Sequence, residues 1–122
     1  MISSLRLLFA LVFVFSFSTQ TFATESLEQT IDYLIDYVGK SSATFIRNGS
    51  SYTPAEGVAH IKAKYEHFKK EIKTPEDFIR LSASKSLLTG QPYLVRTKDG
   101  KETRLEEWLT QALKQRRAEH PS

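Results

Sequence analysis

FIRNGSSYTPAEGVAHIKAK, residues 45–64, contains the most strongly marked turn and helix start in the sequence. Asn48-Gly49 predicts a turn, because glycine reaches positive φ without steric cost and the asparagine side chain can bond its own backbone. Thr53-Pro54-Ala55-Glu56 is a capping-box pattern: the threonine hydroxyl accepts from an orphan N–H, proline takes the first helical position, and the glutamate reaches back. A helix is therefore predicted to begin at Pro54.

Helical periodicity continues on both sides of this segment. The helix from Pro54 has apolar residues three and four positions apart, at Val58, Ile61, Tyr65, Phe68 and Ile72. A first helix is predicted over residues 24–40, with Ser26 and Gln29 as its cap pair. Its apolar residues are Leu27, Ile31, Leu34, Ile35 and Val38.

The second half of the chain predicts two more helices and one strand. Thr74-Pro75 starts a short third helix, and Thr103 with Glu106 predicts a capping box for a last helix over residues 104–117. Residues 93–96 are typical of a short strand, but the residues that follow alternate too briefly to predict a partner. The expected fold class is mainly α: a compact bundle of about four helices, one short, with a small β-turn or hairpin before the last helix.

The first 23 residues have the features of a secretory signal peptide. Arg6 supplies the positive charge, residues 7–17 form an almost unbroken apolar run, and Thr21 and Ala23 are small residues at the positions that a signal peptidase reads. An uncleaved anchor is the alternative, although the run is shorter than the roughly 20 apolar residues of a spanning helix. We expect cleavage after Ala23 and a periplasmic protein without a membrane span. Residues 24–118 would form a single small helical domain, with a disordered tail at residues 119–122.

Composition excludes several classes of function. The chain has no cysteine, which rules out disulfides, a thiol nucleophile and cysteine-bound metals. Its net charge is +3, and the basic residues are spread along the chain except at residues 114–117. This weak, dispersed charge does not predict a nucleic-acid partner.

The segment around the second helix start gathers five candidate ligand-binding residues: Arg47, Asn48, Tyr52, His60 and Lys64. Arg47 and the loop N–H groups are expected near the positive end of the helix dipole, where an anion or an acidic sugar would bind. Tyr52 could supply a stacking face. The alternative is structural: Arg47 pairs with an acidic neighbour such as Glu56, and Tyr52 packs on Phe45.

The sequence predicts no catalytic residue, no cofactor and no metal site. His60 and His67 are seven residues apart, about 10 Å along a helix, which is too far for one ion with bonds near 2 Å. Residues 82–85, Ser-Ala-Ser-Lys, match the S-x-x-K pattern of penicillin-recognising enzymes. The other motifs of those enzymes are missing.

Several segments, in order along the chain, together resemble the YfeK-like family of small uncharacterised bacterial secreted proteins. The resemblance includes Phe45-Ile46-Arg47-Asn48-Gly49, Tyr52, His60, Lys64, Thr74 with Glu76-Asp77-Phe78-Ile79, Ala83-Ser84 with Ser86, Gly90-Gln91-Pro92-Tyr93, and Asp99-Gly100 before Trp108-Leu109. It departs from the family at residues 87–89, Leu-Leu-Thr, where a more serine-rich run is expected. The resemblance implies a periplasmic protein and carries over no activity, substrate or cofactor.

Two hypotheses follow. The first is a soluble periplasmic, non-catalytic module that binds a cell-envelope component, such as an anionic or sugar ligand, or a protein partner. The second is a small envelope hydrolase or lyase, in which His60 is the general base and Arg47 or Lys64 stabilises an anion. A nucleophile, base and orienting group cannot be assembled from the sequence, which favours the binding module.

Overall fold

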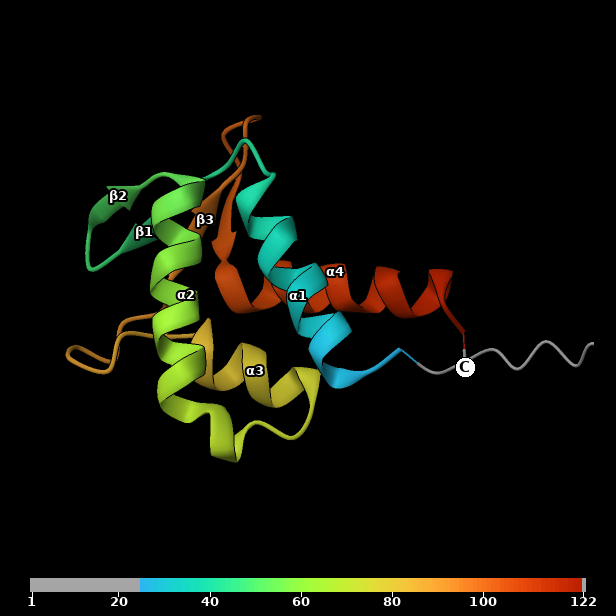
Figure 1. Cartoon of the computed structure of the whole chain (residues 1–122). Coiled ribbons are helices and arrows are strands. Elements are labelled where there is room, and N and C mark those ends of the chain that lie inside the picture. Colours follow the sequence, from blue (N-terminus) through green and yellow to red (C-terminus); the bar gives the residue numbers. More distant parts are fainter. Residues whose placement is uncertain (1–24, 122) are drawn as a thin grey trace, which may run out of the picture.

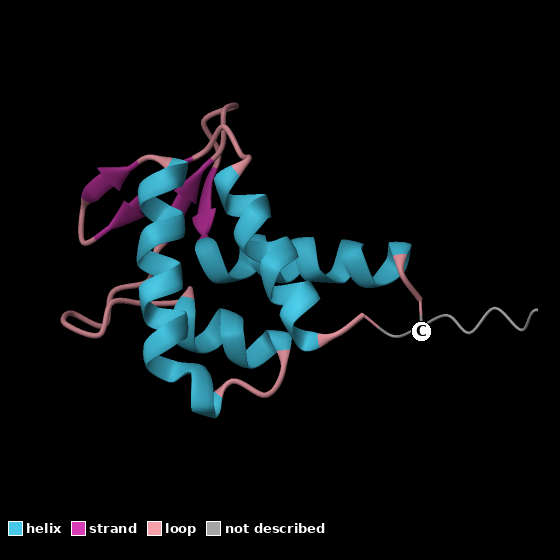
Figure 2. Cartoon of the chain, viewed as in Figure 1, coloured by secondary structure: helices cyan, strands magenta, loops and turns pink. Residues whose placement is uncertain are grey.

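The computed structural model describes residues 25–121, so the expected signal peptide lies outside the described residues. The helices are α1 (Leu27–Gly39), α2 (Pro54–Phe68), the short 3₁₀ helix η2 (Lys69–Glu71), α3 (Pro75–Ser82) and α4 (Leu105–Glu119). The strands are β1 (Thr44–Arg47), β2 (Ser50–Tyr52), β3 (Leu94–Arg96) and β4 (Glu102–Arg104) (Figures 1 and 2). None of the helices in this range is long and apolar enough to cross a membrane.

The four strands form one antiparallel sheet in the order β2-β1-β3-β4. The helix α2 packs against β1 and β2, and α4 packs against β3 and β4 (Figure 1). The expected helical bundle is therefore wrong, because the protein has a mixed α/β fold. Three of the strands have three residues and β1 has four, so the strands are at or below the lower limit of the four to eight residues over which an alternation of apolar and polar residues predicts a strand.

The turn at Asn48-Gly49 joins β1 to β2. Asn48 has a φ of 51° and Gly49 a φ of 81°, and positive φ at both central residues is what a type I′ hairpin turn requires. Phe45 consequently pairs with Tyr52 across the hairpin. The predicted turn is confirmed, but it connects two strands before the helix begins.

Three helix starts are capped as predicted. Ser26 and Gln29 form a complete capping box at α1, and Thr53 and Glu56 form another at α2. At α3, Thr74 is the N-cap residue, its side chain accepts from the Asp77 N–H, and Pro75 is the first helical residue. The predicted box at Thr103 is wrong, because Thr103 is in β4, paired with Val95. In its place Arg104 is the N-cap residue of α4, without a side-chain cap.

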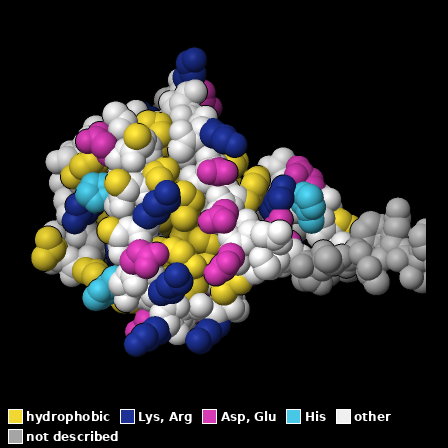
Figure 3. Space-filling model, in the orientation of Figure 1, with side chains coloured by type: hydrophobic (Ala, Val, Ile, Leu, Met, Phe, Trp, Pro, Cys, Tyr) yellow, Lys and Arg dark blue, Asp and Glu magenta, His cyan; other side chains and the backbone are white. Residues whose placement is uncertain are grey.

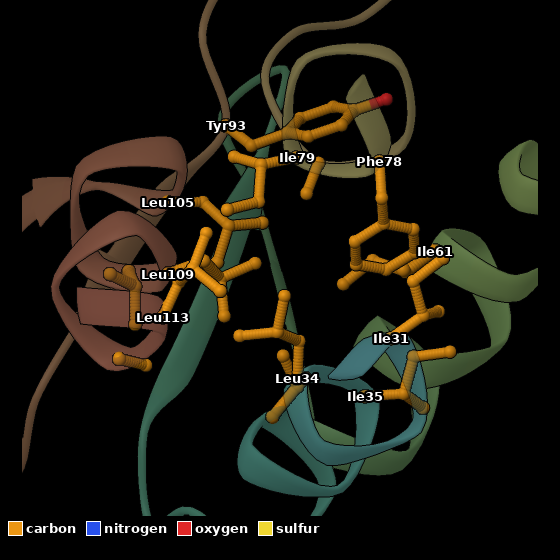
Figure 4. Close-up of a cluster of buried hydrophobic side chains, with 14 of the residues drawn as sticks. Ile31, Leu34, Ile35, Ile61, Phe78, Ile79, Tyr93, Leu105, Leu109 and Leu113 are labelled. Atoms are coloured by element: carbon orange, nitrogen blue, oxygen red, sulfur yellow. The ribbon is translucent and has the colours of Figure 1, made fainter. Parts of the chain in front are cut away.

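The core lies between the sheet and the four α-helices (Figure 4). Phe45 and Val95 are paired neighbours on β1 and β3, and both are buried in it. The ring of Phe45 is 5.8 Å from that of Trp108, in an edge-to-face arrangement. A Cβ on Gly57 would lie 3.3 Å from the Phe45 ring, so the glycine lets α2 approach β1 closely.

An ion pair connects the start of the described chain to α4. Arg116 donates to Glu25 at 2.7 Å, and both side chains are partly buried. This hydrogen bond lowers the pKa of Glu25 below its usual value. Because the folded-state pKa is the lower one, the pair stabilises the fold at neutral pH, and this stabilisation is lost as the pH falls through the lowered pKa.

Candidate functional site

The five candidate residues separate into two groups. Arg47, Tyr52 and His60 line a small cavity between the sheet and α2. Asn48 and Lys64 instead contact the loop that connects α3 to β3. Their role in ligand binding remains a prediction, but their positions define two different places where it can be tested.

The cavity lined by Arg47, Tyr52 and His60 is small and almost entirely apolar. Its volume is about 30 Å³, which has room for a water molecule but not for a sugar. The rings of Tyr52 and His60 meet edge to face at 4.9 Å. Ser82, at the end of α3, also lines this cavity.

Two polar atoms around this cavity are buried without a hydrogen-bond partner among the described residues. They are Nε of Arg47 and Oγ of Ser82. Among the described residues, the ion pair of Arg47 with Glu56 that the structural alternative expected is not found. The Glu56 carboxylate accepts from the Thr53 backbone N–H. The S-x-x-K pattern needs its serine and lysine one turn apart on the same helix. Here α3 ends at Ser82, which is fully buried, and Lys85 is exposed beyond the end of the helix.

Ser82→Ala is expected to raise the free energy of unfolding by about 1 kcal/mol, because a buried hydroxyl without a partner costs stability. Ser84→Ala is the matched control: Ser84 is also buried, but its hydroxyl donates to the Arg80 carbonyl at 2.5 Å. We expect this variant to lose about 1 kcal/mol. Urea unfolding of both variants would measure the difference, and a similar loss in both would mean that the Ser82 hydroxyl has a partner, such as a bound water.

Asn48 holds the loop between α3 and β3 from the side of the sheet. Its side-chain amide donates to the Ser86 hydroxyl at 3.2 Å and accepts from the Thr89 hydroxyl at 2.6 Å. Within the loop, Ser86 and Gln91 are joined by a backbone hydrogen bond of 3.0 Å. The turn residue of the hairpin thus fixes the conformation of a segment about forty positions further along the chain.

Lys64 holds the same loop from the side of α2. Its Nζ donates to the Lys85 carbonyl at 2.7 Å and to the Tyr93 hydroxyl at 3.1 Å. An ammonium group has three donors, so one N–H of Lys64 stays available.

A surface pocket with a surplus of positive charge lies beside Lys64. Its volume is about 620 Å³, within the usual range of about 300–1,000 Å³ for small-molecule sites. We call it the basic pocket; its lining residues are Lys64, Phe68, Arg80, Leu81, Ser84, Lys85, Leu87, Gly90, Pro92, Arg104 and Glu106.

Four basic residues line the basic pocket, against the single carboxylate of Glu106. They come from α2, α3, the loop after α3, and β4. Arg80 is partly neutralised by Asp77, which it contacts at 2.9 Å. Sequence reasoning identified Lys64 alone, because no local motif connects it with Lys85 or Arg104.

Comparison with known proteins identifies the family of this chain. The model of the family of unknown function DUF5329 matches residues 25–117. The chain belongs to the DUF5329 family. This confirms the predicted resemblance, because the chain is also similar to the uncharacterized protein YfeK of Salmonella typhimurium, with 41% identity over 54 residues.

The similarity to YfeK covers 44% of this chain and 45% of the relative, so it spans less than half of either protein. No solved structure matches the DUF5329 chain. The family and its relative therefore supply no ligand or reaction, and the functional argument depends on the basic pocket and its surroundings.

Proposed function

We propose that this protein is a non-catalytic binding module of the bacterial periplasm, which holds an anionic group of a cell-envelope component in the basic pocket. The observation that carries the proposal is the convergence of Lys64, Arg80, Lys85 and Arg104 around one pocket with a single carboxylate. Phosphate and carboxylate groups are the natural partners of such donors. Export to the periplasm is part of the proposal and is supported by the signal-like features of residues 1–23.

The position of the basic residues supports binding over catalysis. The alternative enzyme needs Arg47 or Lys64 beside His60. Arg47 and His60 line the small apolar cavity, where His60 contacts the Tyr52 ring, whereas Lys64 lines the basic pocket and bonds the loop. A cavity of about 30 Å³ has no room for a substrate next to His60.

Inorganic phosphate and glucuronate are suitable soluble probes for the basic pocket. In NMR titrations we expect backbone amide shifts to concentrate at residues 80–92 and 104–106. The double variant Lys85→Gln/Arg104→Gln should weaken phosphate binding at least tenfold, because it removes two of the four cations. Both side chains are exposed, so the fold should be retained.

The matched control is Lys62→Gln/Lys114→Gln, which removes the same charge from two exposed lysines outside the pocket. We expect it to bind phosphate like the wild type. An equal weakening in the two double variants, or shifts scattered over the whole surface, would mean that the anion responds to net charge and would overturn the proposed site.

A further inference from the structure

The loop between α3 and β3 presents two adjacent leucines to solvent. Leu87 is 66% exposed and Leu88 is 85% exposed, and among the described residues these are the large hydrophobic side chains that stand out as exposed. The loop protrudes from the body of the protein at the lower left of Figure 1. Figure 3 shows hydrophobic atoms at this tip. Two neighbouring leucines held in water have an unfavourable hydration free energy that contact with an apolar phase would relieve.

Hydrogen bonds keep these leucines in their exposed position. The Leu88 N–H donates to the Ser86 hydroxyl at 3.2 Å, and the Gly90 N–H donates to the Ser86 carbonyl at 2.9 Å. The two bonds from Asn48 fasten the loop to the hairpin. Because these bonds already constrain the backbone of the tip, burying it in a partner costs little further backbone entropy.

The leucines adjoin the cations of the proposed anion site. Leu87 and Gly90 line the basic pocket together with Lys64, Lys85 and Arg104. An apolar tip and a cluster of cations therefore form one continuous surface, which we call the leucine–cation face (Lys64, Lys85, Leu87, Leu88, Arg104).

The chemistry of this face is complementary to an anionic bilayer. Peripheral proteins bind membranes by inserting apolar side chains at the headgroup–acyl boundary of the bilayer, while neighbouring basic groups contact the lipid phosphates. A protein partner could cover the leucines as well, but the surplus of three positive charges lining the pocket favours a surface that is itself dense in negative charge.

We propose that the leucine–cation face docks the protein on the surface of an anionic phospholipid membrane. Leu87 and Leu88 enter the bilayer at the acyl boundary, and the basic pocket holds a lipid phosphate. The inference rests on the proposed anion site and names its ligand as a phospholipid headgroup in a bilayer.

Vesicle co-sedimentation tests this docking, using the chain from residue 24 onward, which corresponds to the expected mature protein. We expect binding to vesicles of phosphatidylcholine and phosphatidylglycerol in equal parts, and at least tenfold weaker binding to phosphatidylcholine alone. Raising the salt concentration should weaken the binding, because surface charges are screened.

Leu87→Ser/Leu88→Ser should reduce binding to the anionic vesicles at least tenfold. The control is Thr97→Ser/Thr110→Ser, which changes two side chains outside the leucine–cation face and should bind like the wild type. Ile46→Ser would be unsuitable as a control, because Ile46 lies in a paired strand. Circular dichroism verifies that each variant is folded. Undiminished vesicle binding by the leucine variant, or equal binding to neutral vesicles, would overturn the proposal.

The soluble probe separates this inference from the proposed function. The leucine variant keeps all four cations and should bind inorganic phosphate as the wild type does, whereas Lys85→Gln/Arg104→Gln should lose both phosphate and vesicle binding. Phosphate binding without vesicle binding in the wild type would overturn membrane docking alone and would leave a soluble anion or an acidic protein as the partner. Failure to bind phosphate in the pocket would overturn the anion site.

Discussion

Phe78→Ala is expected to lower the free energy of unfolding by about 3–5 kcal/mol. Phe78 is fully buried in α3, and its ring meets Tyr65 of α2 edge to face at 5.6 Å. It lies within the core cluster of Figure 4. Truncation removes buried apolar surface and leaves a cavity that the surrounding side chains fill only partly. Domains of this size are stable by about 5–15 kcal/mol, so the loss is a large part of the total.

Phe68→Ala is the matched control for this prediction, because it makes the same change at a partly buried position on α2. We expect less than half of the loss seen for Phe78→Ala. Urea unfolding followed by far-ultraviolet circular dichroism measures both variants. Equal losses would contradict the position of Phe78 at the centre of the core.

Phe45→Ala is also expected to lower the free energy of unfolding by about 3–5 kcal/mol. This variant tests the packing of the sheet. Phe45 connects β1 to α4 through Trp108 and to α2 at Gly57. Ile46 points to the other face of the strand and is only half-buried, so Ile46→Ala should cost clearly less. A difference between neighbouring residues is expected of a strand with one buried face; similar losses at both positions would contradict it.

Gly57→Val adds an independent measure of the same contact. When Phe45 is present, the added valine side chain meets its ring, and overpacking of this kind lowers the free energy of unfolding by about 1–3 kcal/mol. With Phe45 replaced by alanine, the space left by the ring accepts the valine. The double variant should therefore lose less than the sum of the two single losses, and strict additivity would mean that α2 does not approach β1 at this point.

The helices were predictable because their signals are local. The boxes at Ser26 and Thr53 each need residues only three positions apart, and the structure has both. The sheet was missed because β1 pairs with β3, a contact between segments far apart in the sequence. One local signal was available: Asn48-Gly49 between two short runs with β-forming residues is typical of a hairpin. The capping pattern at Thr103 was misleading, because the pairing of β4 with β3 took precedence over it.

The candidate site was predictable only where its residues lie close together in the sequence. Asn48 and Lys64 both hold the loop after α3, so the segment from 45 to 64 does organise its surroundings. Lys85 and Arg104 reach the same pocket only through tertiary structure, and no sequence spacing connects them. Leu87-Leu88 did carry a signal, since two adjacent apolar residues in a polar loop belong to no helical or strand period.

The pairing of β1 with β3 also sets the order in which the protein can fold. Phe45 pairs with Val95, fifty positions further along the chain, and closing so long a loop costs entropy before any contact repays it. The hairpin of β1 and β2 can form early, but its central strand gains its second neighbour only when the last third of the chain is present. A chain still emerging from the ribosome can therefore form the hairpin of β1 and β2, but it cannot complete this sheet until β3 and β4 have been synthesised.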